Sequence, residues 1–409
     1  MRVLNCLSRS HLGGANWRVA FVARILASRQ VETIVLFPDN GDLQFQTLLG
    51  TWNIPYVRLR LSQLRKPRRI IHNLRHLGTM FAQVRRIAGT IARERIDLLH
   101  VNAVTNFVPV LSAIVSAKPV VWHWNDTLTP RWFAAVMKCV AWAPHVYVAA
   151  ASKTVGRKYA LARMGECYLG LIEPPAIPPQ DEVPAYETVQ LRRDLPVIGF
   201  VGGLVEMKGV LEFVEVMARL RSEGMALRAY VVGNAPPGHG EFYDSLRRRI
   251  VQLGLDETIV FLGYRFDAAY LMTQMDVLLF PSWSEASSLV VLQALAVGLP
   301  IAATAVGDND AILAPFGMPV MKPGDVPAMT RAVKDLLAMD RAMKDDYARR
   351  ASSYVEAHHS PQAVARRHAE LYERILKASG AKKSAHGHAA AAAPNAERAD
   401  PDEKVYDID

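Results

Sequence analysis

The second half of the chain alternates short apolar runs with stretches whose apolar residues recur every three or four positions. Six runs predict buried strands: 197–201, 228–232, 259–262, 276–280, 301–306 and the short run 318–321. Uninterrupted runs of this length are typical of parallel strands, and the periodic stretches between them are typical of connecting helices. The pattern predicts a doubly wound α/β domain.

The first half repeats this alternation. Its predicted strands are 2–7, 31–37, 96–102, 119–122 and 146–151. Gly13 and Gly14 precede a periodic helix after the first strand, and a glycine pair at such a turn lets backbone approach a ligand closely. We therefore expect a second doubly wound domain that faces the other one.

Proline content and low complexity set the expected boundaries. Five prolines fall between Pro174 and Pro184, which predicts a stiff linker. After Gly324 the pattern predicts three helices, 326–337, 341–359 and 361–378. From Ala381 the composition is that of a disordered tail. The predicted parts are an N-terminal domain (1–178), a linker (179–194), a second domain (195–358), a closing helix (359–379) and the tail (380–409).

Composition describes a soluble globular protein, with 51% hydrophobic and 21% charged residues. Three cysteines without metal-binding spacing favour a reducing compartment. Polar residues interrupt the N-terminus and the apolar stretches 101–121 and 133–151, so we expect neither a secretory signal nor a membrane span. These features predict a cytoplasmic protein, while the net charge of +9 favours an anionic partner.

Positive charge is concentrated between Arg58 and Arg95, where eleven Arg or Lys residues accompany one acid, Glu94. Apolar residues recur there at helical spacing: Leu74, Leu77, Phe81, Val84 and Ile87. Two interpretations stay open, a solvated helix face and a patch that binds an anionic membrane, where each cation adds about 1 kcal/mol. No nucleic-acid-binding motif accompanies the charge, so we expect no nucleic-acid partner.

The strongest chemical signal lies between Asp276 and Asp308. The sequence of this segment predicts a strand, a polar loop, a helix and a second strand. Ser287 or Ser288 can cap the helix, whose first N–H groups are suited to bind an anion. Glu285, just ahead of them, is suited to accept hydrogen bonds from hydroxyls beside a phosphate. A sugar attached to a diphosphate presents both groups.

Two further turns carry candidate chemistry. Gly202 and Gly203 end the strand 197–201, and Lys208 follows at a helix start, so N–H groups and an ammonium can meet at a phosphate. Tyr264 and Arg265 end the strand 259–262, where either can stack on a nucleotide base or simply cap the turn.

Histidines follow two strands of the first domain. His123 comes just after the predicted strand 119–122, at the edge where open α/β sheets bind ligands, and His100 lies in the strand 96–102. Asp126 can orient either ring or begin the next loop. A structural role and a functional role stay open for both histidines.

The segment from Pro281 onward resembles the donor-site signature of retaining GT-B glycosyltransferases of group 1, the glycosyltransferase family 4-like proteins. It reads Pro-Ser, a Glu four residues after the proline, a polar residue eight positions later, and Ala-x-Gly-x-Pro. The resemblance implies two facing Rossmann-like domains, an N-terminal acceptor domain and a C-terminal nucleotide-sugar donor domain, with a crossover helix that returns to the first. It also implies sugar transfer from a nucleotide-diphosphate sugar.

The resemblance assigns the candidate residues to roles. It implies that Glu285 contacts the donor sugar, that Lys208 holds the diphosphate, and that His123 lies beside the transferred sugar. The implied nucleotide-binding residues are Gly13, Gly14, Gly202, Gly203, Tyr264, Arg265, Ser287, Ser288, Leu289 and Gln293. Two of them depart from the family pattern, since Gly203 stands at a usual Arg and Gln293 at a ribose-binding Glu.

These departures keep a second function open, that of a catalytically impaired nucleotide-sugar binding or scaffold protein. A related epimerase needs further carboxylates that we do not identify, and a dehydrogenase needs a G-x-G-x-x-G motif that is missing. No Asp-x-Asp motif stands where a metal-dependent transferase needs one, so we expect no metal and no cofactor. The expected acceptor is a saccharide or a polyprenyl-linked saccharide at the inner face of the cell membrane; the oligomeric state is not predicted.

Overall fold

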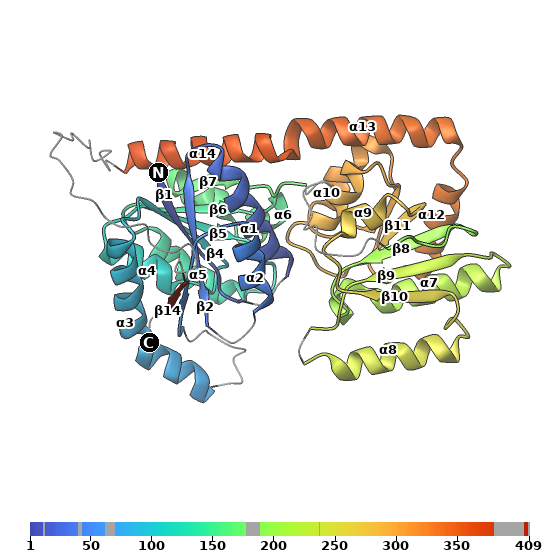
Figure 1. Cartoon of the computed structure of the whole chain (residues 1–409), viewed down its shortest axis with the longest axis horizontal. Helices are drawn as coiled ribbons and strands as arrows, with labels where there is room; N and C mark the ends of the chain where they lie inside the picture. The colour runs from blue at the N-terminus through green and yellow to red at the C-terminus, as the bar shows by residue number, and fades with distance from the viewer. Residues whose placement is uncertain are drawn as a thin grey trace, which may run out of the picture. The chain divides into compact units, whose positions relative to one another are not determined.

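The chain divides into two compact units in a computed structural model that describes residues 1–10, 13–39, 43–61, 70–176, 189–236, 238–379 and 405–407. Unit 1 consists of Met1–Ala151, Val155–Ile172 and Val364–Asp409, and unit 2 consists of Ser152–Thr154 and Glu173–Ala363. Figure 1 labels the helices and strands of both units.

Unit 1 is built on an eight-stranded sheet, counted over the described residues, and all of its strand pairs are parallel. Its strands, in their order across the sheet, are β14 (Val405–Asp407), β3 (Tyr56–Leu59), β2 (Glu32–Pro38), β1 (Arg2–Cys6), β4 (Leu98–Asn102), β5 (Val120–Trp124), β6 (Val146–Ala150) and β7 (Tyr168–Leu171). The chain reverses direction across the sheet between β1 and β4, which makes this the switch point where doubly wound folds bind ligands.

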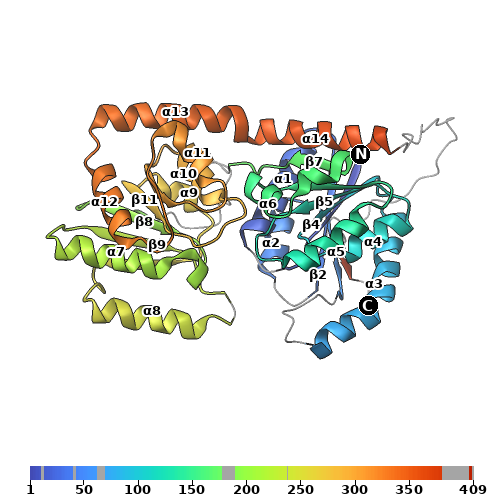
Figure 2. The same cartoon turned by 180° about the vertical axis from the view of Figure 1, so that it is seen from behind.

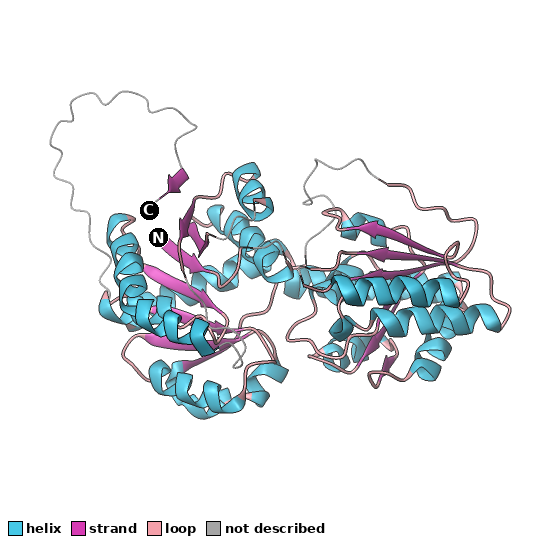
Figure 3. Ribbon diagram, turned by 90° about the horizontal axis from the view of Figure 1, so that it is seen from below, coloured by secondary structure: helices cyan, strands magenta, loops and turns pink. Residues whose placement is uncertain are grey.

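Helices cover both faces of this sheet (Figure 3). They are α1 (Gly14–Ala27), α2 (Gln44–Thr51), α3 (Ile70–Arg93), α4 (Val108–Val115), α5 (Arg131–Ala141), α6 (Lys153–Lys158), the 3-10 helix η1 (Leu161–Cys167) and α14 (Pro361–Ala378). Val364 and Tyr372 of α14 pack with Leu26 of α1 over Val3 and Val121 of the sheet. The helices α3, α4 and α5 follow β3, β4 and β5 in the chain, and they cover the other face of the sheet (Figure 2).

Unit 2 holds a six-stranded parallel sheet within the described residues. Its strands, in their order across the sheet, are β10 (Ile259–Gly263), β9 (Arg228–Val232), β8 (Val197–Val201), β11 (Val277–Phe280), β12 (Ile301–Thr304) and β13 (Val320–Met321). Its helices are η3 (Glu206–Lys208), α7 (Val210–Ser222), α8 (Gly240–Gln252), α9 (Ala268–Met272), α10 (Leu289–Ala296), α11 (Asn309–Leu313), η4 (Ala314–Phe316), α12 (Val326–Leu337) and α13 (Arg341–His359).

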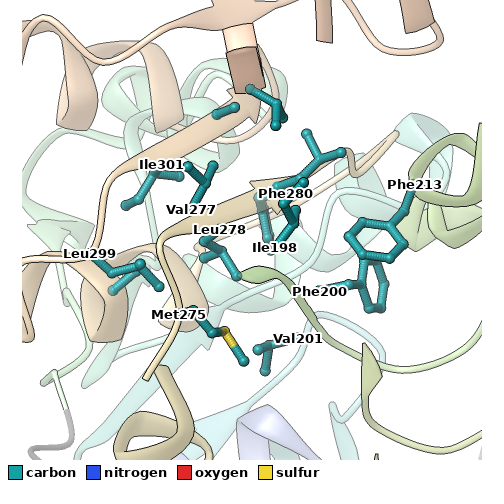
Figure 4. Packing of buried hydrophobic residues seen from close by; sticks show 14 of the residues in the cluster. Ile198, Phe200, Val201, Phe213, Met275, Val277, Leu278, Phe280, Leu299 and Ile301 are labelled. Atoms are coloured by element: carbon teal, nitrogen blue, oxygen red, sulfur yellow. The ribbon is translucent and has the colours of Figure 1, made fainter. Parts of the chain in front are cut away.

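The core of unit 2 explains why its strands are apolar on both faces. Every residue of β8 is buried, because helices pack on both sides of a central parallel strand. The ring of Phe200 lies 5.6 Å from that of Phe213 on α7, and Figure 4 shows both beside Ile198 and Leu278. Full burial of each such side chain contributes about 1.5–3 kcal/mol, so the apolar runs fix where the strands lie.

The predicted fold class, two doubly wound α/β domains, is confirmed, as are the eleven predicted strands and the three helices after Gly324. One position was wrong: β5 runs to Trp124, so His123 lies within the strand rather than after it. Two strands, β3 and β7, were not predicted. The division between the units falls at Ile172 and Glu173, where the sequence suggested 178.

Parts of two predicted segments lie outside the described residues. These are most of the proline-rich linker and, apart from three residues, the tail. At those three residues the structure has a strand, β14, which pairs with β3, so the expectation of disorder is wrong there.

We expect Gly298→Ala to destabilise the protein by about 2–4 kcal/mol. Gly298 has a φ of +68°, which strains any L residue by about 1–2 kcal/mol, and an added Cβ would lie 2.6 Å from that of Ala348. The matched control is Gly317→Ala, where φ is also +68° but nothing lies within 4 Å. Urea unfolding followed by circular dichroism measures both; equal losses would show that the steric contact is unimportant.

Candidate functional site

Two loops of unit 2 meet at the carboxyl edge of its sheet, one after β8 and one after β11. The backbone N–H of Trp283 donates a hydrogen bond to the carbonyl of Met207 at 2.9 Å. Gly209 has a φ of +71°, and an added Cβ would lie 2.0 Å from the carbonyl oxygen of Pro281, so only glycine allows this approach. The two loops are therefore held backbone against backbone.

This approach brings together Lys208 and Glu285, two of the residues singled out in the sequence. Lys208 Nζ lies 2.6 Å from Glu285 Oε1, and Ser282 Oγ donates to the same oxygen at 2.8 Å. The hydroxyl of Thr304 in turn donates to the carbonyl of Ser282 at 2.5 Å. Glu285 is buried and Lys208 is half-buried, so one carboxylate oxygen is fixed by two donors and oriented by a buried network.

The start of α10 lies three residues after Glu285. Ser288 occupies the N-cap position, but its side chain makes no cap hydrogen bond, so the predicted capping is wrong in that detail. Its hydroxyl is buried without any hydrogen-bond partner in the described part of the chain. Ser287 and Leu289 are half-buried, and Gln293 lies one helical turn after Leu289 and is buried. This helix start combines backbone N–H groups with an unsatisfied hydroxyl.

The other predicted nucleotide-binding residues of unit 2 lie along the same edge. Gly202 and Gly203 follow β8, and the Gly202 N–H donates to the carbonyl of Val232 at the end of β9. Tyr264 follows β10, where its N–H donates to Asn234 Oδ1 at 3.0 Å. Arg265 forms a largely buried ion pair with Asp267 at 2.6 Å, so it has a structural partner within its own turn, and stacking on a base stays a prediction.

In unit 1, Gly13 and Gly14 lie at the start of α1. Gly13 is extended and serves as N-cap, and its carbonyl accepts the first helical hydrogen bond from Trp17 at 2.9 Å. Asn16 Nδ2 donates to the carbonyl of Arg9 at 2.8 Å, which braces the turn between β1 and α1. The glycine pair therefore lies where the sequence placed it, beside the switch point of the sheet.

A buried polar network surrounds His123 at the carboxyl ends of β1, β4 and β5. Arg18 on α1 donates from one amino group to His123 Nδ1 at 3.2 Å and from the other to Asn102 Oδ1 at 2.7 Å. His100 Nε2 lies 3.3 Å from His123 Nδ1, and His100 Nδ1 lies 2.6 Å from the hydroxyl of Tyr372 on α14. All of these side chains are buried.

The chemistry of the donors fixes the tautomers in this network. A guanidinium can only donate, so His123 Nδ1 is an acceptor and its proton is on Nε2. His100 then donates from Nε2, and its Nδ1 accepts from Tyr372. His123 Nε2–H is buried without a hydrogen-bond partner in the described part of the chain, which makes it a donor that a bound hydroxyl could satisfy.

Burial keeps the rings neutral. It lowers the pKa of His123 well below its usual value, helped by the charge of Arg18, and lowers the pKa of His100 well below its usual value, helped by His368 and Arg18. Burial also lowers the pKa of Arg18 to about 10 and raises that of Tyr372. Arg18 forms no ion pair among the described residues, so it remains a buried, uncompensated cation.

Sequence reasoning missed three members of this network, Arg18, His368 and Tyr372. For Arg18 there was a signal, since it is a cation in the first half of an apolar helix, one turn after Gly14. For Tyr372 there was none, because its partner His100 lies 272 residues away in the chain.

Two general features of the described part of the chain bear on function. It holds no group of three His, Cys, Asp or Glu side chains arranged to bind a metal ion. None of its helices is long and apolar enough to span a bilayer.

Residues 195–339, which include the Lys208 and Glu285 loops, match the family model for "Glycosyl transferases group 1". Through this segment, about a third of its length, the chain is similar to the group 1 glycosyltransferases. The matched segment contains β8 to β13 and all the predicted nucleotide-binding residues of unit 2.

Curated glycosyltransferases are similar to part of the chain. The 2-deoxystreptamine glucosyltransferase of Streptomyces kanamyceticus is 32% identical over 145 residues, which is 35% of this chain and 36% of the relative. The lipopolysaccharide core biosynthesis mannosyltransferase LpsB of Rhizobium meliloti is 30% identical over 130 residues, 32% of this chain and 37% of LpsB. The chain thus matches about a third of the length of these relatives.

Solved structures share the whole fold. The Anabaena protein HepE in complex with UDP and glucose has a TM-score of 0.73 and 20% identity, covering 91% of this chain and 100% of HepE. WaaG, a glycosyltransferase involved in lipopolysaccharide biosynthesis, has a TM-score of 0.60 and 17% identity, and the match covers 93% of this chain and 100% of WaaG. At these sequence identities, the likeness to the solved structures shows the fold alone.

We expect the protein to lose stability as the pH falls from about 6.5 to about 4. Burial lowers the pKa of His368 to about 4, so between these values the unfolded chain binds more protons than the folded chain. Removing that imbalance with His368→Gln should recover up to about 3 kcal/mol of the loss.

Urea unfolding followed by tryptophan fluorescence tests this, because six of the seven tryptophans lie in unit 1. The control is His145→Asn, which removes an exposed imidazole of the same unit. An unchanged slope of stability against pH in His368→Gln would contradict the expectation.

Proposed function

We propose that the protein transfers a sugar from a nucleotide-diphosphate sugar to a saccharide acceptor. The observation that carries the proposal is the Lys208–Glu285 pair beside the start of α10, inside the segment that matches the family model. An ammonium and a helix start suit a diphosphate, and a buried carboxylate next to them suits the hydroxyls of an attached sugar. Relatives with glycosyltransferase names, and the complex of HepE with UDP-glucose, support a nucleotide-sugar donor.

In this proposal Lys208 and the backbone N–H groups of Gly203 and the Ser287–Ser288 helix start stabilise the leaving diphosphate. Gly202 shapes the turn, because its own N–H already donates to the carbonyl of Val232. Lys208 has three N–H donors, and the bond to Glu285 uses one of them, so donors remain for phosphate oxygens. Glu285 has its Oε1 held by Lys208 and Ser282 and accepts from a sugar hydroxyl. The buried hydroxyl of Ser288 gains a phosphate partner when the donor binds.

The proposed reaction retains the configuration at the anomeric carbon. The bond from that carbon to the diphosphate oxygen breaks, and a bond to the acceptor hydroxyl oxygen forms on the same face. The acceptor proton passes to the departing diphosphate oxygen, so no protein base and no metal take part. Lys208 provides the main electrostatic stabilisation in this step, because negative charge grows on the diphosphate as the bond breaks.

Unit 1 contributes His123, whose Nε2–H is proposed to donate to a hydroxyl of the transferred sugar. Tyr264, Arg265, Leu289 and Gln293 are proposed to contact the nucleoside, and Gly13 and Gly14 to approach the ligand with their backbone. The proposed acceptor is a saccharide or polyprenyl-linked saccharide of a cell-surface polysaccharide or glycolipid. The protein would work in the cytoplasm at the inner membrane face, with the basic segment 58–95 against anionic lipids; residues 62–69 of it lie outside the described part.

The test is a panel of UDP-, GDP- and ADP-sugars in EDTA, measured by thermal shift and by slow donor hydrolysis. We expect one donor to stabilise the wild type and to be hydrolysed, and Glu285→Gln and Lys208→Met to lower hydrolysis by roughly 10²–10³-fold. Lys208→Arg should retain part of the rate, because the cation remains. Glu206→Gln, an exposed acid two residues from Lys208, is the matched control and should behave as wild type.

Gly203 and Gln293 favour one alternative, a scaffold protein that binds nucleotide sugars without turnover. Binding of a donor by the wild type with no hydrolysis, and no transfer to lipid-linked acceptors, would establish that alternative. Failure of every donor to bind would refute both functions.

A further inference from the structure

The helix α5 of unit 1 presents apolar side chains to solvent. Trp132 is 65% exposed and Val136 52%, and Leu128 just before the helix and Trp142 at its end are 65% and 70% exposed. Large apolar side chains gathered on one helix of a soluble fold mark an interaction surface. None of these residues belongs to the proposed binding site for the sugar donor.

A cavity of about 340 Å³ lies beside this helix, and its charged lining is entirely cationic. Its lining residues are Arg131, Ala134, Ala135, Lys138, Arg157, Lys158, Tyr159, Ala160 and Arg163. None of the five cations forms an ion pair with an acid in the part of the chain that the structure describes. Lys158 donates to the carbonyl of Thr127, and its ammonium also lies 5.7 Å from the ring centre of Tyr159.

Asp126, which contacts the cavity residue Tyr159, is already engaged. Asp126 Oδ1 accepts from the backbone N–H groups of Leu128 and Thr129 at 3.0 and 2.8 Å, and it lies 3.5 Å from the hydroxyl of Tyr159. Across the cavity Lys138 and Arg163 repel each other: the pKa of Lys138 is lowered by burial and further by the charge of Arg163. An anion in the cavity would relieve this repulsion.

Helical geometry places the cavity next to the apolar surface. Arg131, Ala134, Ala135 and Lys138 share one face of α5, at spacings of three and four residues. Trp132 and Val136, four residues apart, form the adjacent stripe, about 100° around the helix. A cationic cavity bordered by exposed apolar side chains fits an amphiphile with an anionic head.

We propose that α5 is a docking surface for an anionic phospholipid bilayer, with one lipid phosphate in the cavity. Trp132 and Trp142 suit the headgroup region, where tryptophan is enriched, and Val136 reaches the acyl boundary. The five cations then face headgroup phosphates, each adding about 1 kcal/mol. A free phosphate would satisfy the cavity but would leave the apolar stripe in water. This surface is separate from the basic segment 58–95 and does not depend on the proposed reaction.

The test is co-sedimentation of the full-length protein with vesicles of mixed phosphatidylglycerol and phosphatidylcholine, and with phosphatidylcholine vesicles alone. We expect binding only to the mixed vesicles. Arg157→Gln with Arg163→Gln should lower the partition coefficient by roughly 30-fold, since two cations are lost. Trp132→Ser with Val136→Ser should lower it by roughly tenfold or more. Donor hydrolysis and circular dichroism confirm that each variant is folded.

The matched controls lie on α8 of unit 2. Val251→Ser changes an equally exposed apolar residue, 62% exposed, and Arg248→Gln changes an exposed cation; both should bind vesicles as wild type does. Undiminished binding of both α5 variants would overturn the proposal, and so would binding lost only when the cations of 58–95 are changed. Thermal stabilisation by inorganic phosphate without any vesicle binding would also overturn it, in favour of a free anion. Sedimentation needs no turnover, so this result and that of the donor panel are independent.

Discussion

A parallel sheet must be covered by helices on both faces, and this constraint shapes unit 1 more than any other. The chain up to Ile172 supplies α1 and α2 for one face and α3, α4 and α5 for the other. The rest of the first face is covered by α14, whose Val364 and Tyr372 pack over Val3 and Val121. The same helix carries the hydroxyl that bonds His100, so one packing interaction completes both the core of the unit and the polar network around His123.

The two candidate clusters obey one rule of parallel sheets, that side chains at the carboxyl ends of neighbouring strands meet at one edge. In unit 2 this rule unites Lys208 and Glu285, which are 77 residues apart, and the close backbone approach of Gly209 to Pro281 sets their distance. In unit 1 it unites Asn102 and His123 with Arg18. The clusters differ in charge balance: the first pairs a cation with an acid, whereas the second buries a cation among neutral groups.

Much of the fold could be predicted because its strongest elements are local patterns. The run 197–201 and the helix 326–337 appear in the structure with the predicted bounds. The strand β3 was missed because Arg58 interrupts a run of four residues, and β7 because Gly170 does. The loop chemistry at Lys208 and Glu285 was readable from spacing, but their ion pair was not, and neither was the His100–Tyr372 bond. Such contacts depend on tertiary packing between distant segments, which no local pattern encodes.

The place of α14 in the chain has a consequence for biosynthesis. A ribosome adds roughly 5–20 residues per second, so the 200 residues from Ile172 to Tyr372 take about 10 to 40 s to make. Throughout that interval the nascent unit 1 has the strands β1 to β7 but lacks the helix that covers Val3, Leu98 and Val121. Its apolar face stays open to chaperones or to other nascent chains until the last helix emerges. The N-terminal half of this protein is thus made first and finished last.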